Sequence, residues 1–311
     1  MAEVKQYIFF DFEMLCSNRG MTFNNMEAIR LGAVKYELET ESVAYFDMYI
    51  KPQHKKPLSR FCKKLTGITD EDLADAQDFK GVFQAFLTWV GGVKKSRFFS
   101  WSTSDLLRLK LDAERHMLHE TTINKIEKRY VDFQGIFTKR VSKTNPSVEN
   151  ALAFYDLSFL GEKHNPMYDA FNTLRIYLSF QKNPVKSDLV MIRQFILEDL
   201  PESSEEINKK LKEQLAKDVA GYKKELSDIY KMKDAGKIVK RTRRLVEKYE
   251  NVLINRSGIF TQEIKESINL LVVFYHDLLS CYEHHFNHSS KIMVLEDRIT
   301  EPINELLLKR G

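Results

Sequence analysis

Five ionisable residues in three short segments have the types and order to bind metal ions. They are Asp11 and Glu13 in YIFFDFEM, Asp105 in WSTSDLLRL, and His164 and Asp169 in GEKHNPMYDA. Carboxylate oxygens are the ligands that Mg²⁺ and Mn²⁺ prefer. A neighbouring imidazole, with an ordinary pKa of about 6.5, can accept a proton from water. Together these residues predict a site for two metal ions.

The first pair ends an apolar run. Residues 7–12 are mainly aromatic and β-branched, which is typical of a strand buried on both faces. Side chains alternate along a strand, so we expect Asp11 and Glu13 on one face, about 7 Å apart. A cation bound between them would offset their repulsion and lost hydration. The alternative is a strand that has ended, with both acids in water, and it is the commoner outcome for an isolated Asp-x-Glu.

The second pair flanks the predicted start of a helix. Asn165-Pro166 has the residues of an N-cap and a first helical position, and apolar spacing from Ala170 onward continues the helix. His164 is then in the loop before the helix, and Asp169 is about one turn inside it. This arrangement lets the carboxylate bind metal while the imidazole accepts a proton. A lone His at such a place is more often a capping or surface residue.

Asp105 follows a predicted strand at residues 97–101 (RFFSW) and a turn of helix-capping residues, Ser102–Ser104. Leucines at 106, 107 and 109 continue into a predicted helix. In open α/β sheets ligands bind outside the carboxyl ends of the strands, so this position favours a ligand. The alternative is an Asp favoured in the first helical turn by the helix dipole.

Residues 5–182 resemble the DEDDh family of 3′-to-5′ exonucleases. Four acids and one His occur there in this chain order, and the His-x4-Asp spacing seen here separates the family from its Tyr-bearing sister group. The segments between the motifs are also similar: EAIRLGAVKYE to the second strand of the family, YIKP to the end of its third, and LSRFCKKLTGITDEDL to the segment that frames the bound 3′ end. The last of these is similar to the branch of histone-mRNA 3′ exonucleases and their bacterial relatives.

The resemblance implies a ribonuclease-H-like mixed sheet flanked by helices. It implies two Mg²⁺ or Mn²⁺ ions as cofactors and release of 5′-mononucleotides from single-stranded 3′ ends of RNA or DNA. Carried over residue by residue, it gives His164 as general base and four metal ligands: Asp11, Glu13, Asp105 and Asp169. It also places four residues beside the terminal sugar and base, unless they only pack in loops: Met14, Thr66, Gly67 and Ile68.

Two features depart from the family pattern. Pro166 stands where the family usually has Ala, which fits a helix start but stiffens the loop that carries His164. Ser102 and Ser104 replace the common Asn and Phe of the middle motif. Asp105 is therefore the least secure ligand, and Asp112, further along the same predicted helix, is its alternative.

The composition indicates an ordinary globular chain. It has 311 residues, 43% of them hydrophobic, which is enough for one or two domains with a sizeable core. Three widely spaced cysteines favour neither a disulfide framework nor a zinc ribbon, so we expect a reducing, cytoplasmic location. We expect no signal peptide, because a strand begins almost at Met1, and no membrane-spanning segment.

Beyond an interruption at residues 181–187 the pattern becomes helical. We expect an exonuclease domain at residues 1–182 and an all-helical bundle or hairpin of unknown role at 187–311. Apolar residues from Ile207 to Ile229 predict one long helix that breaks at Gly236. Three further apolar stripes predict helices over 242–253, 264–282 and 295–306.

Residues 209–248 are strongly basic, with 14 Lys or Arg against 6 Asp or Glu, a local charge of +8 in a chain of +4. The excess is concentrated at 237–244 (KIVKRTRR). Such a segment can contact nucleic-acid phosphates or a protein partner. The alternatives are a solvated helix face and a role in oligomerisation. A rival for the whole chain is a weakly active or inactive nucleic-acid-binding module whose helical part recruits a partner.

Cys281, His285 and His288 fall on one face near the end of a predicted helix and have the types of three zinc ligands. No fourth ligand is evident. Favourable placement of His at a helix C-terminus is the more frequent explanation of such a cluster.

Overall fold

The computed structural model describes residues 3–18, 20–255 and 257–308. The chain forms two compact units. One contains the residues up to 138 together with 144–182, and the other contains 139–143 together with the residues from 183 onward. Of the described helices, none is both long and apolar enough to cross a lipid bilayer.

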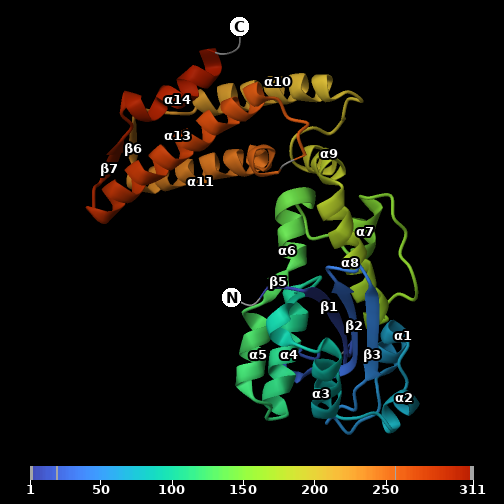
Figure 1. The fold of residues 1–311 in the computed structure, drawn as a ribbon. Coiled ribbons are helices and arrows are strands. Elements are labelled where there is room, and N and C mark those ends of the chain that lie inside the picture. The colour runs from blue at the N-terminus through green and yellow to red at the C-terminus, as the bar shows by residue number, and fades with distance from the viewer. Residues whose placement is uncertain (1–2, 19, 256, 309–311) are drawn as a thin grey trace. The chain divides into compact units, whose positions relative to one another are not determined.

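A five-stranded mixed sheet is the centre of the first unit (Figure 1). Its order is β3-β2-β1-β4-β5. The β3–β2 and β2–β1 pairs are antiparallel, and the β1–β4 and β4–β5 pairs are parallel. The strands are β1 (Gln6–Met14), β2 (Ala28–Glu37), β3 (Val43–Tyr49), β4 (Ser96–Ser100) and β5 (Tyr130–Asp132). The expected ribonuclease-H-like mixed sheet flanked by helices is confirmed.

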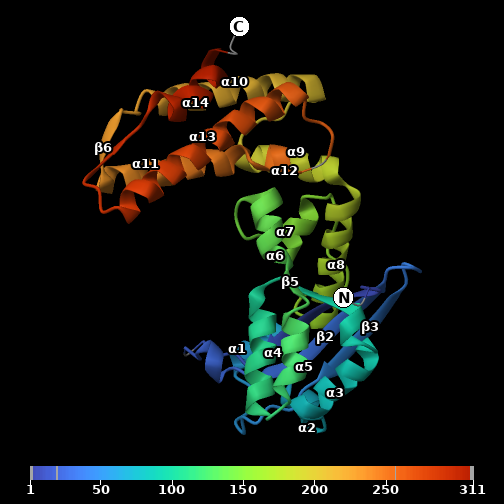
Figure 2. The ribbon, with the colours of Figure 1, turned by 60° about the vertical axis from the view of Figure 1, so that its left-hand side comes forward.

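Helices cover both faces of this sheet (Figures 1 and 2). Ile8, Phe10 and Phe12 of β1 pack in a core with α3, α4 and α5, whereas Tyr7 and Phe9 contact the Tyr177 ring of α8. The odd-numbered side chains of β1 therefore face α8. The helices of this unit are α1 (Arg60–Thr66), α2 (Asp70–Ala74), α3 (Phe79–Val90), α4 (Thr103–Arg115), α5 (Glu120–Glu127), α6 (Phe133–Phe137), α7 (Val148–Ala153) and α8 (Pro166–Lys182).

The second unit has its own apolar core, and α13 contacts α10, α11 and α14 within it. The unit is not all-helical, because two short antiparallel strands pair Ile229 with Val294. Its elements are α9 (Pro184–Phe195), α10 (Ser204–Lys223), β6 (Ile229–Lys231), α11 (Met232–Tyr249), α12 (Asn251–Ile254), α13 (Gln262–Asn287), β7 (Ile292–Val294) and α14 (Asp297–Leu308).

The predicted helix break at Gly236 is wrong. The long helix ends earlier, at Lys223, and Ile229 belongs to strand β6 instead. Gly236 lies inside α11, where a Cβ atom would be 3.3 Å from the Tyr282 hydroxyl of α13. The glycine therefore permits a close approach of two helices instead of ending one.

Candidate active site

Strand β1 directs two carboxylates toward α8. Asp11 and Glu13 continue the face on which Tyr7 and Phe9 contact α8, and they pair with Gly32 and Arg30 of β2. The β1–β2 register shifts between Glu13 and the next residue. Such irregularities often occur where a strand leaves its sheet beside a functional site. The two acids thus lie at the carboxyl end of the strand, as the sequence predicts.

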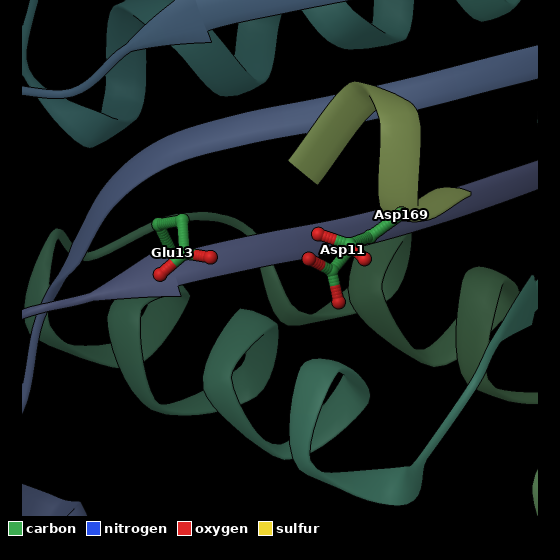
Figure 3. A group of neighbouring side chains, drawn as sticks. All are labelled: Asp11, Glu13 and Asp169. Carbon is green, nitrogen blue, oxygen red and sulfur yellow. The ribbon is translucent and has the colours of Figure 1, made fainter. Parts of the chain in front are cut away.

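A glycine allows α8 to lie directly against β2. A Cβ atom at Gly32 would be 1.9 Å from the backbone nitrogen of Met167 and 2.2 Å from the carbonyl carbon of Pro166. Only a residue without a side chain fits there. The first turn of α8 is therefore held beside the strand, and it brings Asp169 next to Asp11 (Figure 3).

Three carboxylates form the centre of the site. One carboxylate oxygen from each of Asp11, Glu13 and Asp169 lies within 4.8 Å of the other two. Figure 3 shows the three side chains on β1 and α8. Asp105, in the first turn of α4, accepts a hydrogen bond from the Phe12 backbone N–H (3.3 Å), and its side chain bonds to that of Asp11. A cavity of about 270 Å³ is lined by all four acids and His164.

Burial and mutual repulsion raise the pKa values of these acids when no cation is present. Desolvation is the largest cause for each of them, and neighbouring carboxylates add to it for Asp11 and Glu13. The pKa of Asp11 is raised well above its usual value, that of Glu13 to about 8, that of Asp105 to about 7 and that of Asp169 to about 6. An oxygen-only donor set with this excess of negative charge fits a hard divalent cation.

These pKa shifts predict how the stability of the protein without bound metal depends on pH. The folded protein holds protons that the unfolded chain releases, so the metal-free protein is most stable below the ordinary pKa values of 3.8 for Asp and 4.5 for Glu. Its stability falls as the pH rises from there through the folded values, about 6 for Asp169 and about 8 for Glu13. We expect the melting temperature in EDTA to fall over this whole range, and Glu13→Gln to flatten the curve between its values of 4.5 and about 8. Calorimetry of the wild type and of Glu13→Gln gives the melting temperature at each pH. Curves of the same shape for the two proteins would contradict the raised pKa of Glu13.

His164 lies in the loop before α8, exposed to solvent. Its φ of +61° is in the left-handed region, which is uncommon for a residue with a side chain and often marks a functional site. Its backbone N–H donates to the Asp169 carboxylate, which lowers the pKa of that carboxyl group and partly offsets the effect of burial. The loop is also packed closely at Gly161, where a Cβ atom would be 2.2 Å from the Tyr168 ring.

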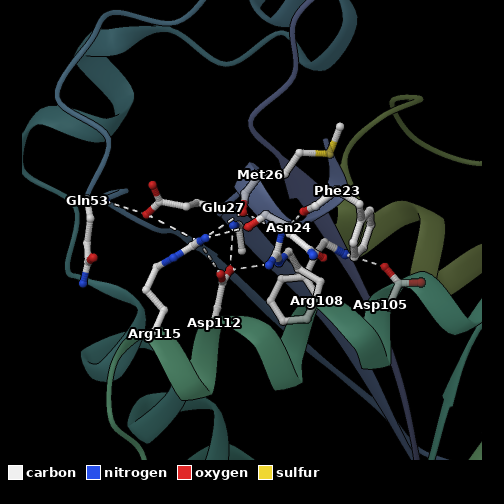
Figure 4. A network of polar contacts seen from close by, with 11 residues as sticks. Phe23, Asn24, Met26, Glu27, Gln53, Asp105, Arg108, Asp112 and Arg115 are labelled. Atoms are coloured by element: carbon white, nitrogen blue, oxygen red, sulfur yellow. Dashed lines mark hydrogen bonds and ion pairs between the residues drawn. The ribbon is translucent and has the colours of Figure 1, made fainter. Parts of the chain in front are cut away.

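Asp112 is not a replacement for Asp105, because its oxygens are already bonded. Oδ2 accepts from the Ala28 backbone N–H (2.8 Å) and lies 3.2 Å from Arg108 Nε, and Oδ1 accepts from Arg115 (2.9 Å). Only 1% of Asp112 is exposed. Figure 4 shows these contacts, with Asp105 and Asp112 at different places along α4. Asp112 therefore connects α4 to the first residue of β2.

Of the four residues expected near the terminal nucleotide, Met14 lines the cavity. Thr66, Gly67 and Ile68 do not line it. Thr66 donates to the carbonyl of Cys62 and accepts from the Ile68 backbone N–H, and Gly67 ends α1 with a φ of +71°. Ile68 is 1% exposed and packs in an apolar cluster. Their contact with substrate remains a prediction.

Cys281, His285 and His288, the three residues with the types of zinc ligands, do not form a metal-binding group. In the parts of the chain that the structure describes, the three acids above are the one group of His, Cys, Asp and Glu side chains close enough to share an ion. Cys281 Sγ is 3.8 Å from His285 Nδ1, but His288 Nδ1 is 2.8 Å from the His284 carbonyl. All three cysteines are free thiols.

Ser100, at the end of β4, is a site residue that the sequence pattern did not indicate. Its hydroxyl is 2.7 Å from the Tyr130 hydroxyl, and its hydrogen bond to Asp105 lowers the pKa of that carboxyl group. Ser102 and Ser104 line the cavity, in the positions where the chain departs from the family pattern. The only sequence signal for Ser100 is its place at the end of a strand.

The comparisons with known proteins agree with this geometry. Residues 8–177, more than half of the chain, match the Exonuclease family RNase_T. ERI1 exoribonuclease 2 of Danio rerio is 25% identical over 190 residues, which cover 53% of this chain and 33% of that protein. The 3′-5′ exonuclease crn-4 of Caenorhabditis elegans is 26% identical over 165 residues, covering 48% of this chain and 54% of that protein.

The solved structures give the same fold. The nuclease domain of 3′hExo, described as a DEDDh family member bound to rAMP, superposes with a TM-score of 0.52 at 20% identity, covering 58% of this chain and 96% of that one. The match to the curated relatives spans about a third to a half of their lengths. On the family match over residues 8–177, the chain belongs to the Exonuclease family RNase_T.

Proposed function

We propose that the protein is a metal-dependent 3′-to-5′ exonuclease that releases 5′-mononucleotides from single-stranded 3′ ends of RNA or DNA. The observation that carries this proposal is the group of Asp11, Glu13 and Asp169 carboxylates, which shares its cavity with Asp105 and His164. Family membership supports the reaction class. The four carboxylates and the imidazole are the groups that this reaction would use.

The four carboxylates would hold two Mg²⁺ or Mn²⁺ ions. When bound, two such ions lower the pKa of a water molecule, orient the scissile phosphate and stabilise the attacking and leaving oxygens. Asp105 contributes by fixing the side chain of Asp11, because it bonds to that carboxyl group and to the Phe12 backbone N–H. Asp169 is fixed by the first turn of α8 and by the His164 backbone N–H.

His164 would accept the proton of the attacking water at a ring nitrogen. Its side chain is exposed and lines the cavity, so it can reach water there and afterwards pass the proton to solvent. The left-handed backbone at His164 sets the direction in which the imidazole leaves the chain. Pro166 fixes the start of α8 just after it.

We expect His164→Ala to lower the rate at saturating substrate by about 10²- to 10⁴-fold, the usual contribution of a general base. Mn²⁺ affinity should change little, because the side chain is not assigned as a ligand. The measurement is single-turnover hydrolysis beside a Mn²⁺ titration. His119→Ala, at the exposed N-cap residue before α5, is the matched control and should keep full activity. An unchanged rate in His164→Ala would remove the residue from the reaction.

Met14 would contact the terminal nucleoside, which its place in the cavity wall supports. We keep Thr66, Gly67 and Ile68 in the proposal as a second contact. Of these, Gly67 is exposed at the end of α1, and Ile68 would have to leave its apolar cluster to touch a base.

End-labelled substrates test the proposal. Single-stranded RNA and DNA of matched sequence, labelled at either end, are incubated with Mg²⁺ or Mn²⁺. A 3′ label should appear at once as mononucleotide, and a 5′ label should give a ladder that shortens one nucleotide at a time. The comparison also gives the preferred sugar. Internal cuts, or binding without hydrolysis, would contradict the proposal.

We further propose that residues 1–182 carry the hydrolytic site and residues 187–311 form a separate domain. The division into two compact units supports this, although residues 139–143 belong to the second unit. The Asn251 side chain donates to the Lys139 carbonyl (2.9 Å) within that unit. A cytoplasmic location is part of the proposal, supported by three free thiols.

A further inference from the structure

Helices α10 and α11 run antiparallel and are joined by side-chain contacts. The Tyr222 hydroxyl lies 2.5 Å from the Thr242 hydroxyl, and the Tyr249 hydroxyl donates to Asp218 (2.7 Å). The residue number of the partner on α10 falls from 222 to 218 as that on α11 rises from 242 to 249, which is the pattern of an antiparallel pair. These contacts join the two helices at Asp218 and Tyr222 of α10.

A groove of about 1110 Å³ is formed by α10 with Arg241 and Leu245 of α11. Ala216 and Ala220 contribute small side chains to it, and Gly221 has none, with open space where its Cβ atom would be. From Lys209 to Lys224 the groove follows about 22 Å of helix. A surface of this length can hold several nucleotides of an extended strand.

Most of the charged groove residues that form no ion pair with the described residues are positive. Its lining has five basic and three acidic residues. Two of the acids are neutralised, since Asp218 pairs with Lys248 and Glu225 pairs with Arg241. Glu213 has no ion pair in the described chain.

Three lysines of the groove are exposed and unpaired. Lys209, Lys217 and Lys224 have no ion pair within the residues that the structure covers. They recur eight and seven residues apart, which is about 12 and 10 Å along the helix. Arg241 and Arg243, from the most basic stretch of the sequence, are already paired with Glu225 and Glu247. The unpaired lysines of the groove thus lie on α10 and at its C-cap.

We propose that this groove binds the sugar–phosphate backbone of a single-stranded nucleic acid, with Lys209, Lys217 and Lys224 contacting phosphates. Lysine ammonium groups are mobile point charges that suit phosphates without fixing a base sequence. The single aromatic residue in the lining, Tyr222, is buried and bonded to Thr242, so base stacking contributes nothing. The groove is a strand-binding surface in addition to the proposed catalytic site, and it has little sequence preference.

The test is oligonucleotide binding in EDTA, so that its outcome does not depend on hydrolysis. Fluorescence anisotropy with labelled 12-mers of dT and U is measured at several salt concentrations. The groove variant is Lys209→Ala, Lys217→Ala and Lys224→Ala combined. The control is Lys231→Ala, Lys233→Ala and Lys291→Ala combined, which removes the same charge from exposed lysines of this unit outside the groove. Arginine at the three groove positions is the rescue variant.

We expect the groove variant to bind about 10- to 100-fold more weakly at 150 mM salt. The slope of log affinity against log salt should fall by about 2, since each phosphate contact on a single strand contributes about 0.7. The control should retain the wild-type slope, and the arginine variant should restore it. Equal losses in both alanine variants would overturn the proposal. A second outcome would also overturn it. If the wild type bound polyglutamate but no oligonucleotide, and the groove variant bound neither, the groove would be assigned to an acidic protein segment.

Discussion

Replacing Asp11 with Asn should lower the rate of hydrolysis at saturating substrate by at least about 10³-fold. Asp11 lies within 4.8 Å of Glu13 and Asp169 and is bonded to Asp105, so its carboxylate connects the whole acidic group. An amide has the same shape but supplies no negative charge to a cation. Removing one such electrostatic contact in an active site typically costs a factor of 10² to 10³, and loss of a bound ion costs more.

The same variant should be at least as stable as the wild type without metal. Burial and repulsion from Asp105 raise the pKa of Asp11, so its charge is unfavourable in the folded state when no cation is present. Melting temperatures in EDTA at about pH 8 measure this. Asp78→Asn, which keeps a good N-cap at the start of α3, is the control and should retain activity. An Asp11→Asn enzyme with near wild-type rates would contradict the assignment of this site.

Replacing Gly32 with Ala should cost stability and activity together. The new Cβ atom would be 1.9 Å from the Met167 backbone nitrogen, and backbone cannot move aside as a flexible side chain can. Helix α8 would have to move away from β2, and overpacking of this kind costs about 1–3 kcal/mol or more. Because Asp169 is in the first turn of α8, its carboxylate would leave the group formed with Asp11 and Glu13.

Thermal unfolding and Mn²⁺ titration of Gly32→Ala check both effects. We expect a lower melting temperature and Mn²⁺ affinity reduced by at least about tenfold. Gly92→Ala is the matched control, since a Cβ atom there meets only the Lys95 side chain at an ordinary 3.7 Å. A Gly32→Ala protein with unchanged metal affinity would show that the contact between α8 and β2 does not position Asp169.

The sequence predicted those parts of the site that follow from local rules. Strand alternation placed Asp11 and Glu13 on one face, and the Asn165-Pro166 pair marked the start of α8 at the observed residue. Asp105 lies in the first turn of α4, as expected. The fold class followed from the same patterns and from the resemblance of the motifs to a known family.

Features that depend on contacts between distant residues could not be predicted. Gly32 and Met167 are far apart in sequence, and nothing near either of them signals that they touch. The burial of Asp112 depends on Arg108 and Arg115 and on the first residue of β2. Gly236 appeared as a helix break because glycine is a poor helix former, but packing against Tyr282 outweighs that preference.

The number of Mn²⁺ ions that the protein binds tests the central claim most directly. Electron paramagnetic resonance titration of free Mn²⁺ gives this number for the wild type and for Asp11→Asn. We expect two ions for each wild-type chain in the presence of a nucleoside monophosphate, and fewer than two for Asp11→Asn at the same concentrations. Equal numbers in the two proteins, or no binding by the wild type, would show that the carboxylates around Asp11 are not the metal site.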